Sequence, residues 1–83
     1  MNELNYRVYS PDDVLIAATR NASDAAVVVW SYGIGYQVRL GPSKRSTIFT
    51  VTDDNYEDAH DWDWTADQIL EGRADFNMYG GVK

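Results

Sequence analysis

The stretch from residue 36 to residue 52, YQVRLGPSKRSTIFTVT, decides the fold of this chain. Residues 36–40 alternate between apolar and polar side chains, which places Arg39 on the polar side of a half-buried strand. Residues 47–52 are rich in β-branched side chains that favour strands. The sequence GPSK at 41–44 combines Gly and Pro, which are typical of turns. The stretch therefore predicts two strands of an antiparallel sheet joined by a turn.

A second pair of strands is predicted before residue 20. Residues 4–9 alternate in the same way, and SPDD at 10–13 suits a type I turn with Pro11 at its second position. The same four residues also suit a helix start with Ser10 as the N-cap, so residues 14–19 are compatible with a strand or a helix. We favour the hairpin strand.

Two helices are predicted from their start and stop signals. NASD at 21–24 resembles a capping box, and the helix that follows it ends at Gly33. TADQ at 65–68 resembles a second capping box, with Trp64 and Ile69 as a hydrophobic staple. We expect Gly72 to close this second, short helix.

The order of these elements is approximately ββαββα, which predicts an α+β fold: a small antiparallel sheet with two helices packed on one face. The tail, residues 76–83, either adds an edge strand or frays. A chain of 83 residues is expected to form a single domain, here residues 1–83.

Composition restricts the environment in which this chain is expected to work. It has no cysteine, so it has no disulfides, and small secreted domains usually depend on them. Its first residues lack the basic and apolar regions of a signal peptide, and its longest apolar run, residues 25–30, is far shorter than a membrane span. We therefore expect a soluble, cytoplasmic protein that does not enter membranes.

The negative charge of the chain is concentrated in one segment. Residues 53–67 contain seven of the 13 acidic residues and none of the seven lysines and arginines. The segment therefore carries a charge of −7, and the rest of the chain, with six acids and seven bases, carries +1, which gives the net charge of −6. We call residues 53–67 the acidic segment, and its charge is either a solvated face or a surface for a partner.

The acidic segment also carries aromatic side chains. If its first part is helical, Asp54, Glu57, Asp58 and Asp61 share one face at intervals of three and four residues. Trp62 either belongs to the core or anchors an interface, since Trp and Tyr are enriched at interface hot spots. The predicted partner-binding residues are Asp53, Asp54, Tyr56, Glu57, Asp58, Asp61, Trp62, Asp63 and Asp67.

No motif in the sequence indicates catalysis, a metal site or a cofactor. An EF-hand loop starting at Asp53 or at Asp61 lacks the required Gly at position six and Glu at position twelve. His60 is the only histidine, and it is more consistent with a surface position than with a general base or a metal ligand. Arg39, Lys44 and Arg45 form too small a basic group, beside so acidic a segment, for direct nucleic-acid binding. We expect a protein that is not an enzyme.

In size, acidity and lack of catalytic motifs, the chain resembles the small phage-encoded inhibitors known as anti-CRISPR proteins. The resemblance implies a DNA mimic, in which the acids of residues 53–67 compete with DNA for a basic channel of a CRISPR-Cas effector complex in the host bacterial cytoplasm. The partner would then be a basic nucleic-acid-binding protein, such as a Cas effector subunit.

Two other functions are compatible with the sequence. One is a phage or regulatory interaction module without mimicry, for example an antitoxin-like or homodimeric accessory protein. The other is a weak binder of a cation or small ligand. The first predicts a dimer that survives salt, and the second predicts a melting temperature that rises with calcium or magnesium.

Overall fold

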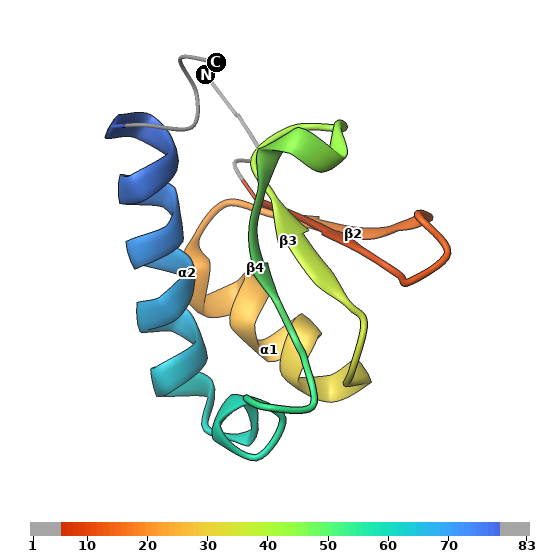
Figure 1. Cartoon of the computed structure of the whole chain (residues 1–83), viewed down its shortest axis with the longest axis vertical. Coiled ribbons are helices and arrows are strands. Elements are labelled where there is room, and N and C mark those ends of the chain that lie inside the picture. Colours follow the sequence, from red (N-terminus) through yellow and green to blue (C-terminus); the bar gives the residue numbers. More distant parts are fainter. Residues whose placement is uncertain (1–5, 79–83) are drawn as a thin grey trace.

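The computed structural model describes residues 6–78, which form a four-stranded sheet and two α-helices (Figure 1). The elements are β1 (Tyr6–Tyr9), β2 (Leu15–Thr19), α1 (Ala22–Tyr32), β3 (Gln37–Arg39), the 3₁₀ turn η1 (Lys44–Ser46), β4 (Thr47–Thr50), the 3₁₀ turn η2 (Asp58–His60) and α2 (Trp62–Met78). Their order confirms the predicted ββαββα arrangement. Residues 4 and 5, at the start of the first predicted strand, lie outside the described residues.

The sheet has the strand order β2-β1-β3-β4, and all of its neighbouring strands are antiparallel. Val8 of β1 faces Val38 of β3, which in turn faces Phe49 of β4. The β1–β2 turn is closed by the Asp13 N–H, which donates to Ser10 O at 2.9 Å, and Asp13 has a left-handed φ of 70°. After this turn, residues 15–19 pair antiparallel with β1 as strand β2, so the strand that we favoured over a helix is confirmed.

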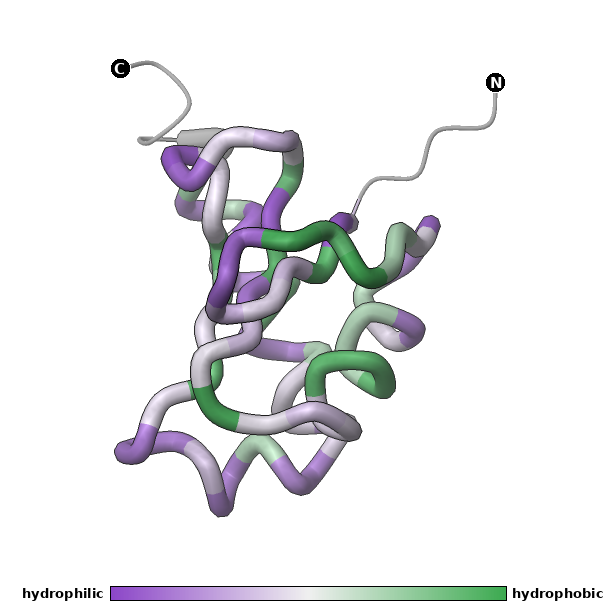
Figure 2. The backbone as a smooth tube through the Cα atoms, turned by 90° about the vertical axis from the view of Figure 1, so that its right-hand side faces the viewer, coloured by the Kyte–Doolittle hydropathy of each residue, from purple (hydrophilic) through white to green (hydrophobic). Residues whose placement is uncertain are grey.

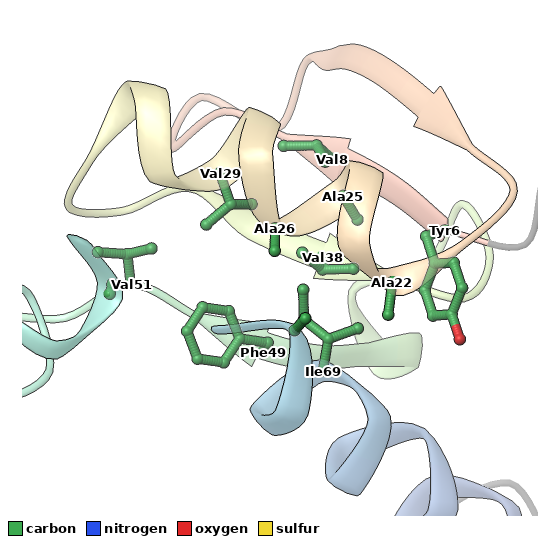
Figure 3. Close-up of a cluster of buried hydrophobic side chains, with 12 residues drawn as sticks. Tyr6, Val8, Ala22, Ala25, Ala26, Val29, Val38, Phe49, Val51 and Ile69 are labelled. Carbon is green, nitrogen blue, oxygen red and sulfur yellow. The ribbon is translucent and has the colours of Figure 1, made fainter. Parts of the chain in front are cut away.

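One hydrophobic core lies between the sheet and the two helices (Figure 3). The predicted N-cap of α1 is confirmed, since Asn21 Oδ1 accepts from the Asp24 N–H at 2.8 Å. The buried face of α1 is built mostly from alanines, whose small side chains let the helix pack closely against β1 and β3. Its core residues are Ala22, Ala25, Ala26 and Val29. Ile69 of α2 reaches the same cluster, so both helices cover one face of the sheet.

The opposite face of the sheet contains a buried arginine. Arg39 has 1% of its surface exposed, and its guanidinium lies 4.0 Å from the centre of the Tyr9 ring. It donates to Gln37 Oε1 at 2.8 Å, to Pro42 O at 3.3 Å and to the half-exposed Asp13 at 2.6 Å. Alternation predicts the side of the strand on which Arg39 lies, but not its burial among contacts from outside its own strand, including Tyr9, Asp13 and Pro42.

The start of α2 differs from the prediction. Asp61, and not Thr65, is the N-cap: its Oδ1 accepts from the N–H groups of Asp63 and Trp64 at 3.0 and 3.3 Å. Thr65 is fully buried in the first turn, where its hydroxyl donates to Ala59 O at 3.1 Å. Trp64 does not act as a staple before the cap, but packs edge-on against Phe49 with ring centres 6.2 Å apart. The sequence contains two capping residues four positions apart, and the buried contacts of Thr65 select the earlier one.

The end of α2 also differs from the prediction, because the helix continues through Gly72 to Met78. Gly72 lies where α2 crosses β4, and a Cβ atom there would overlap the carbonyl oxygen of Ile48. The glycine is therefore needed for close packing and does not end the helix. Residues 76–78 are helical, so they do not form the edge strand considered above, while residues 79–83 lie outside the described part of the chain. Among residues 6–78, no helix has the length and apolar character needed to cross a membrane.

Candidate partner-binding surface

The first half of the acidic segment is a compact loop between β4 and α2, and not an α-helix. It consists of a turn over residues 53–57 followed by η2. Figure 2 shows it as the mostly hydrophilic stretch at the bottom of the molecule. The carboxylate row expected for a helix, Asp54 with Glu57, Asp58 and Asp61, therefore does not form as such. The loop is consistent with the sequence, because Asp and Asn are weak helix formers and like charges four residues apart destabilise a helix.

Polar contacts to the backbone fix the shape of this loop. Thr52 and Asn55 bond reciprocally, with the Thr52 N–H donating to Asn55 Oδ1 at 2.8 Å and the Asn55 N–H donating to Thr52 Oγ1 at 3.3 Å. The Asn55 amide also donates to Thr50 O at 3.0 Å, which ties the loop to β4. Buried Ala59, bonded through its carbonyl to Thr65, ties the other end to α2. The acids are thus carried on an ordered backbone.

All seven acids of the segment have exposed side chains. Within residues 6–78, none of them forms an ion pair with a lysine or an arginine. Among the contacts of the described residues, Asp61 alone has a structural role, as the N-cap of α2. The other six carboxylates have no basic partner within the described residues, and together with Asp61 they form a strongly negative surface that can bind cations.

The structure adds two acids that the sequence analysis did not include. Asp63, Asp67, Glu71 and Asp75 follow one another at intervals of four residues along α2, and all four are exposed. A helix rises about 1.5 Å per residue, so Glu71 and Asp75 lie roughly 12 and 18 Å along the axis from Asp63. The basic residue of this helix, Arg73, points toward the sheet, where its guanidinium donates a hydrogen bond to the Tyr6 hydroxyl at 2.9 Å. The four-residue spacing is present in the sequence, but a helix predicted to end at Gly72 excludes Asp75 and so does not predict the full row.

Both predicted aromatic anchors, Trp62 and Tyr56, are accessible. Trp62 is 47% exposed in the first turn of α2, so it does not belong to the core. Tyr56 is 39% exposed; its ring meets the ring of His60 edge-on at 4.7 Å and lies beside Gly33, at the end of α1. His60 is also exposed, with its Nδ1 2.9 Å from Tyr56 O. Among the described residues, no group of three or more His, Cys, Asp or Glu side chains is placed to hold a metal ion.

Two exposed basic residues, Lys44 and Arg45, lie far from the acidic loop. Lys44 and Arg45 are exposed in η1, at the top of the view in Figure 1, whereas the acidic loop lies at the bottom. Arg39, the third member of that predicted group, is buried and so is not available to a phosphate. The length of β4 separates Lys44 and Arg45 from the acidic loop, whereas the exposed acids of α2 continue from the loop toward the other end of the helix.

Comparison of this chain with protein-family models, with curated proteins and with solved structures finds no match.

Proposed function

We propose that this protein is a non-enzymatic inhibitor that binds a basic, nucleic-acid-binding protein through the acidic segment. The observation that carries the proposal is the exposure of all seven acids of residues 53–67, none of which is paired with a base among residues 6–78. In a chain this small, such a concentration of like charge opposes folding through self-repulsion. A binding role explains why the charge is gathered on one loop and on the adjoining turns of α2.

The proposed mode of binding is mimicry of a nucleic-acid backbone. Carboxylates four residues apart on a helix are spaced by about 6 Å along its axis, and each DNA strand presents one phosphate every 3.4 Å or so. Asp63 and Asp67 follow this helical spacing, and the acids of the loop extend the charge beyond the helix start. Lysines and arginines that normally meet phosphates would bind these carboxylates, which would exclude nucleic acid from the same groove.

Within this class, we propose a DNA-binding subunit of a CRISPR-Cas effector complex as the first partner to test, in a bacterial cytoplasm. This narrower proposal is supported by small size, local acidity and the resemblance to anti-CRISPR proteins described above. The broader proposal does not depend on it, since any basic nucleic-acid groove presents the same chemistry.

The test is capture of partners from a bacterial lysate with the wild-type protein and two charge-matched variants. The loop variant carries Asp54→Asn, Glu57→Gln, Asp58→Asn and Asp61→Asn, where Asn at position 61 keeps the N-cap of α2. The control variant removes four exposed acids outside the segment, with the changes Asp12→Asn, Asp24→Asn, Glu71→Gln and Asp75→Asn.

We expect the loop variant to lose the captured basic protein and the control variant to retain it. Glu71 and Asp75 lie roughly 12 and 18 Å along α2 from Asp63, and charge is felt over roughly 10 Å at 0.1 M salt, so their loss should affect a partner at the loop far less than the loss of the loop's own acids. For the purified partner, the expected loss of affinity of the loop variant is at least about tenfold, or ~1.4 kcal/mol. A loop variant that retains every partner would rule the proposal out.

A second candidate function, self-association, is favoured by one observation. Strand β2 lies at an edge of the sheet, and Val14 and Leu15 at its start are large apolar side chains that are about half exposed. Exposed apolar edge strands are templates for pairing with another chain. A homodimer would give a sedimentation coefficient that falls on dilution and is unchanged by 0.5 M salt. A sedimentation coefficient of a monomer at every concentration would exclude self-association.

A further inference from the structure

Three tyrosines and an isoleucine gather around the turn that follows α1. Tyr32 is 57% exposed and stacks on Tyr36 with ring centres 4.8 Å apart, and Ile34 between them is 49% exposed. Tyr56 joins them from the acidic segment, because its Cε1 lies 3.6 Å from the position of a Cβ on Gly33. We call Tyr32, Ile34, Tyr36 and Tyr56 the tyrosine patch.

The backbone under the tyrosine patch is held in place by several contacts. Gly33 and Gly35 have positive φ angles of 114° and 94°, and a side chain at residue 35 would collide with Pro11 of the β1–β2 turn. The Gly35 N–H donates to Val51 O at 2.8 Å, and the Val51 N–H donates to Tyr36 O at 3.0 Å. The patch is therefore anchored to the residue at which β4 gives way to the acidic loop. Anchors that are already ordered before binding lose little entropy when a partner docks.

The charge beside the patch indicates the chemistry of its occupant. Tyr56 is surrounded in the chain by Asp53, Asp54 and Glu57, all of which are exposed and without a basic partner in the described residues. Such a rim repels nucleic acids and anionic membranes and attracts cationic groups. Aromatic faces bind cations as well, and arginine in particular, because its planar, weakly hydrated guanidinium stacks on a ring. The same pairing occurs inside this protein, where Arg39 lies 4.0 Å from the Tyr9 ring centre.

We propose that the tyrosine patch is the anchoring site of the interface and that its occupant is an arginine-rich protein surface. This inference rests on the proposed function and adds to it in two ways. It places the centre of the interface at the end of α1, where the aromatic side chains are, and leaves the acids as its rim. It also predicts a partner that is recognised through arginine in preference to lysine.

The test uses two defined probes, ten-residue oligoarginine and oligolysine peptides, with binding measured by titration calorimetry at 50 mM salt and by amide chemical shifts. Both peptides carry the same charge, so they differ in the stacking of arginine on rings and in its bidentate hydrogen bonds to carboxylates, which the variants below separate. We expect oligoarginine to bind at least about fivefold more tightly. The amide chemical shifts that change on addition of oligoarginine should be centred on residues 32–36 and 56.

Variants separate the contribution of the rings from that of the charges. Tyr32→Ala/Tyr56→Ala should lower the ratio of the two affinities by removing the stacking on the rings, and Tyr32→Leu/Tyr56→Leu should do the same while preserving apolar packing. Leu70→Ala, which removes another half-exposed apolar side chain, should leave the ratio unchanged. The triple acid variant, Asp53→Asn/Asp54→Asn/Glu57→Gln, should lower the affinity for both peptides to a similar extent.

The outcomes distinguish this inference from the proposed function. If both peptides bind equally and the tyrosine variants behave like wild type, the tyrosine patch is not the anchor, and the acidic surface remains the binding site. If neither peptide binds, or if the triple acid variant binds both as well as wild type, the acidic surface does not bind cationic partners and both proposals are wrong.

Discussion

Arg39 illustrates how a single residue can carry a large share of the stability of a small sheet. Its guanidinium connects Gln37 of the same strand, Asp13 of the β1–β2 turn and Pro42 of the β3–β4 turn, while its flat face covers Tyr9. The sequence pattern predicted the side of the strand, but a contact between residues 26 positions apart has no local signal. Asp13 holds a left-handed φ of 70°, a conformation that Asp tolerates better than most residues.

Arg39→Ala is therefore expected to be strongly destabilising. It would remove a buried side chain, leave Gln37 Oε1 without its donor and release Asp13. We expect the free energy of unfolding to fall by about 3 kcal/mol in urea denaturation. Arg45→Ala, at an exposed position of the neighbouring turn, should change it by less than about 0.5 kcal/mol. Equal effects of the two substitutions would contradict the role assigned to Arg39.

Asp61 has two roles at the residue scale, because it caps α2 and contributes charge to the acidic surface. Asp61→Ala removes both, and we expect a loss of about 1 kcal/mol in unfolding free energy from the missing cap. Asp61→Asn removes only the charge and should unfold close to wild type. If Ala and Asn at this position gave the same stability, the cap would lie elsewhere, for example at Thr65 as the sequence pattern indicated.

At the scale of elements, α2 is where local sequence signals and tertiary contacts disagree most. Glycine after a short apolar stretch usually marks a helix end, and that pattern predicted the end of the helix at Gly72. The missing Cβ instead lets the helix approach the backbone of β4, and packing carries the helix past the glycine to Met78. The longer helix also adds Glu71 and Asp75 to the exposed row of acids.

Gly72→Ala tests this interpretation by the sign of its effect. At an exposed helical position, replacing Gly with Ala stabilises by about 1 kcal/mol. Here the new Cβ would overlap Ile48 O, so α2 must move away from β4, and we expect a destabilisation of about 2 kcal/mol or more in thermal unfolding. The matched reverse change, Ala74→Gly at an exposed position of the same helix, should cost about 1 kcal/mol. A stabilised Gly72→Ala protein would exclude the close contact.

On the scale of the whole molecule, the ββαββα order and the antiparallel sheet were predictable from the sequence. Alternation in the strands, the Asn21 cap and the turns at 10–13 and 41–44 all agree with the final fold, and agreement among local signals is a property of sequences that fold uniquely. The exposure of the acids in residues 53–67 could also be anticipated. The gathering of Tyr32, Tyr36 and Tyr56 could not, since it depends on how the acidic loop returns to the end of α1.

The folded chain carries its negative charge on the acidic loop and along α2, while exposed Lys44 and Arg45 lie at the far end of β4 from that loop. A molecule with a net charge of −6 that is concentrated in this way is expected to approach a basic groove with its acidic surface first, and its association rate should fall steeply with ionic strength. Orientation by charge and anchoring by exposed aromatic side chains would then act on the same end of the protein.

The most direct test of the central claim is a competition measurement on the basic partner isolated in the capture experiment. Fluorescence polarisation of a labelled DNA bound to that partner is followed as this protein is added. We expect the wild type and the control variant to displace the DNA, and the loop variant to fail to do so at the same concentration. Displacement should weaken as salt rises from 50 to 300 mM, in parallel with the binding of the protein to its partner. A stable complex that contains the partner, the DNA and this protein together would contradict mimicry, because a mimic and its nucleic acid cannot occupy one groove.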